Sequence, residues 1–459
     1  MPGSSLSRNL LAMAVALSMS STALATSTAP LTDSPTKRSA GSLARQALAA
    51  HTNESASAIA ELRSMGPEGL RAYLEANQLE IEAATMTLGN SGNVESRNQS
   101  MSAKSNQVLA ALDSICKQKD CFASRLYWYT DFEQAKSAAR VQGKPILSLR
   151  LLGRLDEDLS CANSRLFRIM LYANEQVSEL LRERFVLHWQ SVRPVPTVTI
   201  DFGDGRKMER TLTGNSIHYV LDSEGRVIDA LPGLYGPGAF LRELTRVSSV
   251  ATKLNGFRTD DERSGELSRY HQLRINELEN AWLSDVKRAG LRVAPSREIP
   301  KLAGSTPPSA VKAAAAAISK AAMVERPILR GMSDNPNSLD SIGSDAGWLM
   351  IAGLHAEDAT LDQATRALMA FKDPSLSGVN LQGAIIALER AVAEDTVRNE
   401  YLFRARIHAW LASGSGSSDV ASLNEKIYSE LFLTPSWDAW LGLRPSGAYS
   451  GIDDDGVRR

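Results

Sequence analysis

The sequence predicts a central α/β domain flanked by an all-α N-terminal region and an all-α C-terminal region. In residues 126–250, short apolar runs alternate with segments of helical spacing, which is the pattern of a sheet covered by helices. Two pairs of short β-rich runs there enclose glycine-containing turns, so each pair is typical of a hairpin. On either side, in residues 43–125 and 309–459, apolar residues recur at helical spacing without such runs.

The first 25 residues have the features of a bacterial-type secretory signal peptide. Arg8 gives a positive start, residues 10–17 are apolar, and Ala23-Leu24-Ala25 is a cleavage pattern of the A-x-A kind. The apolar run is shorter than the roughly 20 residues that span a bilayer. We therefore expect a mature chain that begins at Thr26, is periplasmic or secreted, and holds no transmembrane segment.

The N-terminal region is predicted to be helical after a short disordered lead. Residues 26–42 are rich in serine, threonine and proline, a composition that buries little apolar surface. Helical spacing starts at Leu43, and Pro67 stands where a second helix is expected to begin. Residues 88–106 predict a linker, and a further helix is expected to end near Cys116. Residues 43–125 make up this predicted region.

The central domain, residues 126–250, is predicted element by element. Apolar residues share one helical face in 131–142, and Gly143 directly after them predicts the end of a helix. The apolar run at 145–152 predicts a strand, and a second strand is expected at 185–192. The remaining expected elements are helices at 162–173 and 177–184, hairpins formed by 197–200 with 208–212 and by 217–221 with 227–229, and a closing helix from Pro237.

The chain after residue 250 is expected to be helical to its end. Residues 251–308 combine a long charged helix at 260–287 with a proline-rich linker. Ser309 is placed to cap an alanine-rich helix at 310–323. Further helices are predicted at 362–371, 381–393, 395–411 and 421–432, so that residues 309–459 form a helical C-terminal domain.

The charge balance bears on the partners of the chain. It has 51 Lys and Arg against 52 Asp and Glu, a formal net charge of −1. Nucleic acids and anionic lipid surfaces are bound by proteins with a strong basic excess, so neither partner is expected. No phosphate-cradling or dinucleotide motif occurs in a fitting context, and we expect no cofactor. Protein partners in the cell envelope remain as the predicted class.

Three cysteines remain in the mature chain: Cys116, Cys121 and Cys161. An odd number in an oxidising compartment favours one disulfide and one free thiol. Cys116 and Cys121 are the close pair, and the Lys-Gln-Lys-Asp between them suggests a turn in which a bridge is allowed. A bridge from Cys161 to either of them is the competing arrangement.

The amino-acid sequence of the central domain resembles a family of secreted thioredoxin-like domains over residues 126–248. The order helix, strand, Cys-headed helix, strand, hairpin and helix is that of the thioredoxin fold. The similar segments are Trp128-Tyr-Thr-Asp-Phe-Glu-Gln-Ala135 with Gly143-Lys-Pro-Ile-Leu147, then Val177 to Val186, and Tyr219 to Gly233. The resemblance implies the fold more strongly than an activity.

At the C-x-x-C position that the resemblance implies, this chain has Cys161-Ala-Asn-Ser164. The first cysteine is present, the resolving cysteine is replaced by Ser164, and no tryptophan precedes the motif. Asn215-Ser216 stand where the family's cis-proline would precede the strand at 217. A cysteine at a helix N-terminus has its thiolate stabilised, here with Arg165 and Arg168 in the next turns. Cys161 and Ser164 are thus the candidate catalytic residues of a monothiol site.

Two histidines in the predicted strands, His188 and His218, are candidate metal ligands or a candidate base for Cys161. No tight spacing such as H-x-x-x-H accompanies them, so satisfied strand residues are the favoured interpretation and no metal site is predicted.

Two functions follow from these observations. The favoured one is an exported, non-catalytic binding or scaffold module of the cell envelope. The alternative is a protein that exchanges or isomerises disulfides through Cys161, whose thiolate would attack a substrate disulfide. Without a second cysteine, release of the mixed disulfide would need an external thiol. If the chain is an enzyme, it is of this thiol-disulfide kind.

Overall fold

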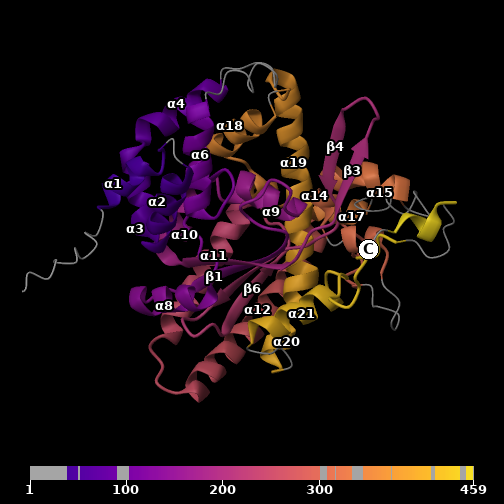
Figure 1. Ribbon diagram of the computed structural model, residues 1–459. Helices are drawn as coiled ribbons and strands as arrows, with labels where there is room; N and C mark the ends of the chain where they lie inside the picture. The colour runs from indigo at the N-terminus through magenta and orange to yellow at the C-terminus, as the bar shows by residue number, and fades with distance from the viewer. Residues whose placement is uncertain are drawn as a thin grey trace, which may run out of the picture. The chain divides into compact units, whose positions relative to one another are not determined.

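A four-stranded mixed sheet lies at the centre of the described chain (Figure 1). Its strands are β1 (Ile146–Leu152), β2 (Val186–Arg193), β5 (Ile217–Leu221) and β6 (Val227–Pro232), in the order β2-β1-β5-β6. β1 pairs parallel with β2 and antiparallel with β5, which pairs antiparallel with β6. All seven residues of β1 are buried because both faces of the sheet are covered. The predicted apolar runs correspond to these strands within one or two residues, except at the end of β6.

This computed structural model describes residues 39–49, 52–89, 103–299, 308–315, 317–332, 345–373, 375–414, 419–444 and 451–457. The predicted signal peptide, residues 1–25, and most of the predicted lead, residues 26–42, lie outside the described residues. The described part of residues 26–42 departs from the prediction, because a helix starts there at Ala40 with Ser39 as its N-cap.

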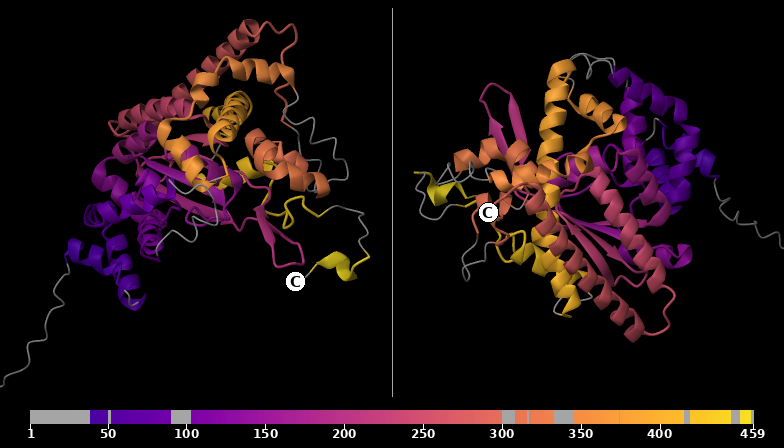
Figure 2. Two further views of the ribbon diagram at one scale, coloured as in Figure 1. Left: turned by 90° about the horizontal axis from the view of Figure 1, so that it is seen from above. Right: turned by 180° about the vertical axis from the view of Figure 1, so that it is seen from behind.

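Helices cover the sheet at the positions that local capping signals fix. α8 (Phe132–Gln142) begins after Asp131, whose side chain accepts from the backbone N–H of Gln134, and ends at Gly143 in a left-handed conformation. The other covering elements are α9 (Ala162–Leu166), the π-helix η1 (Phe167–Leu171), α10 (Glu175–Arg184) and α11 (Pro237–Leu254). A separate hairpin of β3 (Thr197–Asp201) and β4 (Lys207–Thr211) extends away from the sheet (Figures 1 and 2).

The N-terminal helices have a small core of their own, formed by residues such as Leu62, Tyr73, Leu112 and Ile115. They are α1 (Ala40–Gln46), α2 (Thr52–Ser64), α3 (Pro67–Ala76), α4 (Gln78–Gly89), α6 (Ala103–Cys116) and α7 (Cys121–Ser124). The linker predicted at 88–106 was too long at both ends, because α4 continues to Gly89 and α6 starts at Ala103. Its remaining residues lie outside the described ones.

A disulfide joins Cys116, the last residue of α6, to Cys121, the first residue of α7. The turn between them is made by two residues with positive φ, Lys117 and Asp120, so the chain reverses between the two cysteines. Of the two arrangements that the sequence left open, this pairing leaves Cys161 as the free thiol.

Replacing both bridged cysteines, Cys116→Ala with Cys121→Ala, should lower the free energy of unfolding by about 2 kcal/mol. A small loop of this size removes about that much entropy from the unfolded chain. Urea unfolding of both proteins measures the difference. Wild-type protein unfolded with dithiothreitol should lose the same amount; an unchanged midpoint would show that the bridge does not stabilise the fold.

The C-terminal half is helical and shares one hydrophobic core with the sheet. Its elements are α12 (Asp260–Arg288), α13 (Ala310–Ala314), α14 (Ile318–Lys320), η2 (Ala321–Glu325), α15 (Arg326–Met332), α17 (Ala346–Gly353), η3 (Ala356–Ala359), α18 (Gln363–Lys372), α19 (Gly378–Arg398), η4 (Asn399–Arg404), α20 (Ala405–Ala412), α21 (Val420–Glu430) and η5 (Asp453–Gly456).

Two helix predictions in this half were wrong. The single helix expected at 310–323 is broken after Ala314, and a new helix starts at Ile318. The buried carboxylate of Asp395 accepts hydrogen bonds from the backbone N–H groups of Ile318 and Ser319, which caps the new start. Conversely, the helices expected at 381–393 and 395–411 are one continuous run from α19 through the π-helix η4 to α20.

Candidate functional site

Cys161 lies between β1 and α9, at the N-cap of that short helix. Its Sγ is 3.0 Å from the Oγ of Ser216, the residue directly before β5. The cysteine is 0% exposed to solvent. The structure therefore brings together two positions that the sequence analysis had singled out, the cysteine and the residue where a cis-proline was missing. No cis peptide bond occurs in the described residues.

Ser164, the second candidate residue, contacts other groups than the sulfur. Its Oγ is 2.6 Å from the Oγ of Ser160 and 3.0 Å from the carbonyl oxygen of Cys161. Both Ser160 and Ser164 are buried. Ser164 is thus a buried residue whose hydroxyl bonds to neighbours within the turn and has no hydrogen bond to the sulfur among the described residues.

The loop before β5 approaches Cys161 closely. Thr213 and Gly214 both have positive φ, and a Cβ on Gly214 would lie 3.1 Å from the Cβ of Cys161 and 3.0 Å from Cδ1 of Leu152. Only glycine combines this φ of +121° with so little space. The close approach of this loop is one reason why solvent does not reach the sulfur.

Several polar groups around Cys161 are buried without a partner. Both polar side-chain atoms of Asn163 and of Asn215, and the hydroxyl of Thr213, have no hydrogen bond within the described part of the chain. An unsatisfied buried polar group costs roughly 1–3 kcal/mol. Such a cluster is unusual in a core and marks this region as the candidate functional site.

The C-terminal helices cover this cluster. The hydroxyl of Tyr428, on α21, donates to the carbonyl oxygen of Asn215 at 2.7 Å. The ammonium of Lys320, on α14, donates to the carbonyl oxygen of Gly214 at 3.0 Å and lies 3.6 Å from the carboxylate of Glu325. The side chains of Lys320 and Glu325 are both 0% exposed.

Sequence reasoning missed Lys320, Glu325 and Tyr428 as neighbours of Cys161. Lys320 stands in an alanine-rich stretch where a lysine is ordinarily solvated, and no local pattern links it to the loop 106 residues earlier. The signal in the sequence is that Lys320 and Glu325 are the two charged residues among the small and apolar residues of 313–325.

The two arginines that follow Cys161 form hydrogen bonds with groups other than its sulfur. Arg165 donates to the Oγ1 of Thr211 at 2.9 Å, and Arg168 donates to the carbonyl oxygens of Leu155 and Glu157. Burial lowers the pKa of both guanidinium groups. Neither arginine has a hydrogen bond to the sulfur among those that the described residues form.

His188 and His218 are buried inside the sheet, and one nitrogen of each ring has a hydrogen-bond partner. The other nitrogen, Nε2 of His188 and Nδ1 of His218, has none among the described residues, so the expected satisfied strand residues are found only in part. Nδ1 of His188 is 2.8 Å from the Oγ of Ser148, and Nε2 of His218 is 2.7 Å from the hydroxyl of Tyr172. Burial lowers the pKa of each histidine to about 3, so both are neutral at pH 7. Within the described residues, no group of three or more His, Cys, Asp or Glu side chains is arranged to hold a metal ion.

The chain was compared with protein-family models, with curated proteins and with solved structures, and none of them matches it. Among the described residues, no helix combines the length and the apolar character needed to cross a bilayer. The functional interpretation therefore rests on the geometry of the chain itself.

Proposed function

We propose that this chain is an exported protein whose thioredoxin-like domain is a non-catalytic binding module of the cell envelope. The strand order β2-β1-β5-β6, with β1 and β2 parallel and the other pairs antiparallel, supports the thioredoxin-like assignment. So does the position of Cys161 at the start of the helix that follows β1, opposite Ser216.

The burial of Cys161 carries the non-catalytic part of the proposal. A thiolate that exchanges disulfides must approach a disulfide sulfur of its substrate directly, which requires access to solvent. The sulfur of Cys161 lies instead beneath a loop that is held by Lys320 and Tyr428 from the C-terminal helices. This geometry fits a site that has lost its activity and is buried in the core better than it fits a site of monothiol exchange.

The disulfide supports the proposal of export. Disulfides persist in the periplasm and outside the cell, whereas cytosolic thiols are kept reduced. The bridge between Cys116 and Cys121 is buried between two helices of the N-terminal core. Protein partners in the envelope are proposed because helical regions stand on both sides of the sheet in the sequence and no cofactor chemistry is indicated.

Thiol labelling of the purified mature protein tests this proposal. Under native conditions, Cys161 should resist an alkylating reagent across pH 6 to 9, and it should react fully in urea. As a matched control, Ser264→Cys in a Cys161→Ala background places a cysteine at an exposed position of α12, and it should react at once. Fast native labelling of Cys161, with an apparent pKa well below ~8.5, would instead support disulfide exchange.

A further inference from the structure

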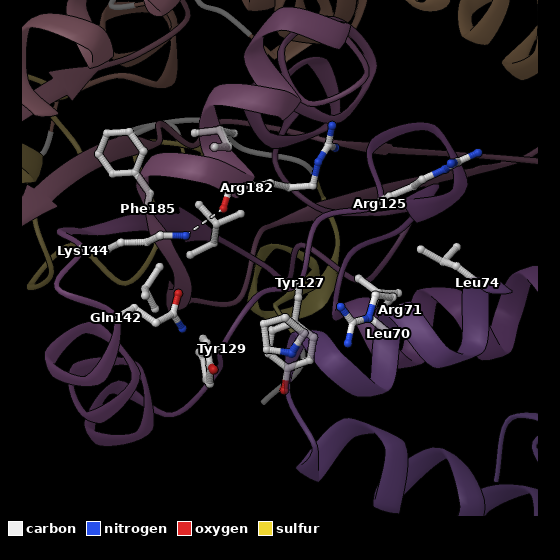
Figure 3. Close-up of a pocket in the computed structure, with 14 residues that line it drawn as sticks. Leu70, Arg71, Leu74, Arg125, Tyr127, Tyr129, Gln142, Lys144, Arg182 and Phe185 are labelled. Carbon is white, nitrogen blue, oxygen red and sulfur yellow. Dashed lines mark hydrogen bonds between the residues drawn. The ribbon is translucent and has the colours of Figure 1, made fainter. Parts of the chain in front are cut away.

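A pocket of about 460 Å³ lies between α3 of the N-terminal helices and the part of the sheet domain formed by α10 and the start of β2 (Figure 3). The segment after α7 and the end of α8 complete its wall. Cys161 is not among its lining residues. Ligand sites are commonly found where two structural regions meet, and a volume of 300–1,000 Å³ is usual for them.

Part of the lining of this pocket, here called its floor, is apolar. It is made by Leu70 and Leu74 of α3, by Leu181 of α10, and by Phe185 and Tyr127 next to the sheet. The hydroxyl of Tyr127 is already used, since it donates to the carbonyl oxygen of Arg63 at 2.7 Å. The floor therefore offers apolar surface, and the other uncharged polar residues of the lining are Tyr129 and Gln142.

The charged residues that line the pocket all have the same sign. They are Arg71, Arg125, Lys144 and Arg182, and no aspartate or glutamate is among the lining residues. Their side chains come from four different segments of the chain (Figure 3).

Three of these four cations lack an ion-pair partner. Arg71 pairs with Glu68, but no carboxylate lies within 4.0 Å of Arg125, Lys144 or Arg182 in the described ranges. Lys144 donates to the backbone oxygen of Arg182, and Arg182 donates to that of Ser124. Burial, and next the charge of Arg125, lower the pKa of Arg182, while the more distant carboxylates of Glu179 and Glu183 act to raise it.

Two arginines at other places on the surface, Arg140 and Arg242, are each neutralised by a carboxylate. Arg140 forms two hydrogen bonds with Glu224, and Arg242 forms two with Asp358. Holding like charges together around an apolar floor is unfavourable unless an anion joins them.

We infer that this pocket binds a small amphipathic carboxylate, with its aliphatic body on the leucine-lined floor and its carboxylate between Arg125 and Arg182. A guanidinium pair suits a carboxylate because each group can donate two parallel hydrogen bonds. The site goes beyond the proposed binding module: it does not depend on Cys161, on the thioredoxin-like assignment or on export.

Isothermal titration of the mature protein with three probes tests this inference. Decanoate carries both features, decyltrimethylammonium has the same chain with the opposite charge, and acetate has the charge without the chain. Decanoate should bind at least tenfold more tightly than either of the others. Equal binding of the cationic probe would show a hydrophobic surface without selectivity for charge. Equal binding of acetate would show a charged surface that does not recognise the aliphatic chain. Either result, or no binding of decanoate, overturns the inference.

Variants locate the site. Arg125→Gln should weaken decanoate binding at least tenfold, and it should fold normally because its guanidinium is exposed and has no hydrogen bond among the described residues. Arg140→Gln is the matched control: it removes an exposed arginine of α8 outside the pocket and should leave binding unchanged. If Arg125→Gln binds decanoate as the wild type does, with an unchanged melting temperature, decanoate does not use this pocket.

Discussion

Arg404→Met should lower the free energy of unfolding by about 3–5 kcal/mol, the usual cost of removing one partner from a buried ionic group. Arg404 belongs to the π-helix η4 and is 0% exposed. Its guanidinium donates to Asp229 at 2.8 Å, to Glu243 at 2.7 Å and to Glu400 at 2.9 Å. Methionine fills a similar volume, so the loss does not report a cavity. It reports mainly the carboxylate of Asp229, because Arg274 stays within 4.0 Å of Glu243 and Glu400.

The pH dependence of the variant follows from Asp229. Burial acts to raise the pKa of Asp229, but Arg404, the two histidines His408 and His271, and the hydrogen bond from Tyr270 together outweigh it, so the pKa lies below its ordinary value. A carboxyl group whose pKa is depressed in the fold contributes stability above its unfolded pKa of about 3.9, and that contribution is lost as the pH falls. The difference between wild type and variant should therefore be largest near neutral pH and shrink below about pH 4.

Urea unfolding followed by circular dichroism measures this loss. Arg406→Met is the matched control, because Arg406 lies two residues further on the same helical run and is exposed. Its unfolding free energy should stay within about 0.5 kcal/mol of the wild type. A loss for Arg404→Met as small as that of the control would show that the carboxylates around it are neutral or solvated.

The strands of the sheet could be predicted because a run of consecutive apolar residues indicates a buried strand. Residues 146–152 are apolar with one serine and one arginine, and a strand covered on both faces needs such a run. The helix start at Ile318 could not be predicted, because it depends on the carboxylate of Asp395, which is 77 residues away. Local helix propensity favours continuation through an alanine run, and a tertiary contact overrides it.

The same distinction applies to the candidate site. The position of Cys161 at a helix start, and that of Ser216 before a strand, follow from local patterns and from the resemblance. The burial of Cys161 depends on Lys320 and Tyr428, which contact its loop from 106 and 213 residues away. The pocket was also missed, because Arg125 and Arg182 come from separate segments and each has the appearance of an ordinary surface residue.

Lys320→Met should destabilise the fold by about 3–5 kcal/mol, because it leaves the carboxylate of Glu325 buried without its ammonium partner. The double variant Lys320→Met with Glu325→Gln should recover most of this loss, since neither charge then remains. Burial raises the pKa of Glu325. A carboxyl group with a raised pKa costs stability only above its unfolded pKa, about 4.3, so the loss in the single variant should diminish as the pH falls towards that value.

The labelling rate of Cys161 connects this ion pair to the candidate site. Lys320 holds the carbonyl of Gly214, and Gly214 lies against Cys161. If the C-terminal helices are what covers the sulfur, a loss of 3 kcal/mol or more in the single variant should speed native alkylation by roughly a hundredfold or more. The double variant should return to slow labelling. A single variant that is destabilised in urea but labels Cys161 as slowly as the wild type would show that the sheet domain itself, and not its helical cover, keeps the thiol from solvent.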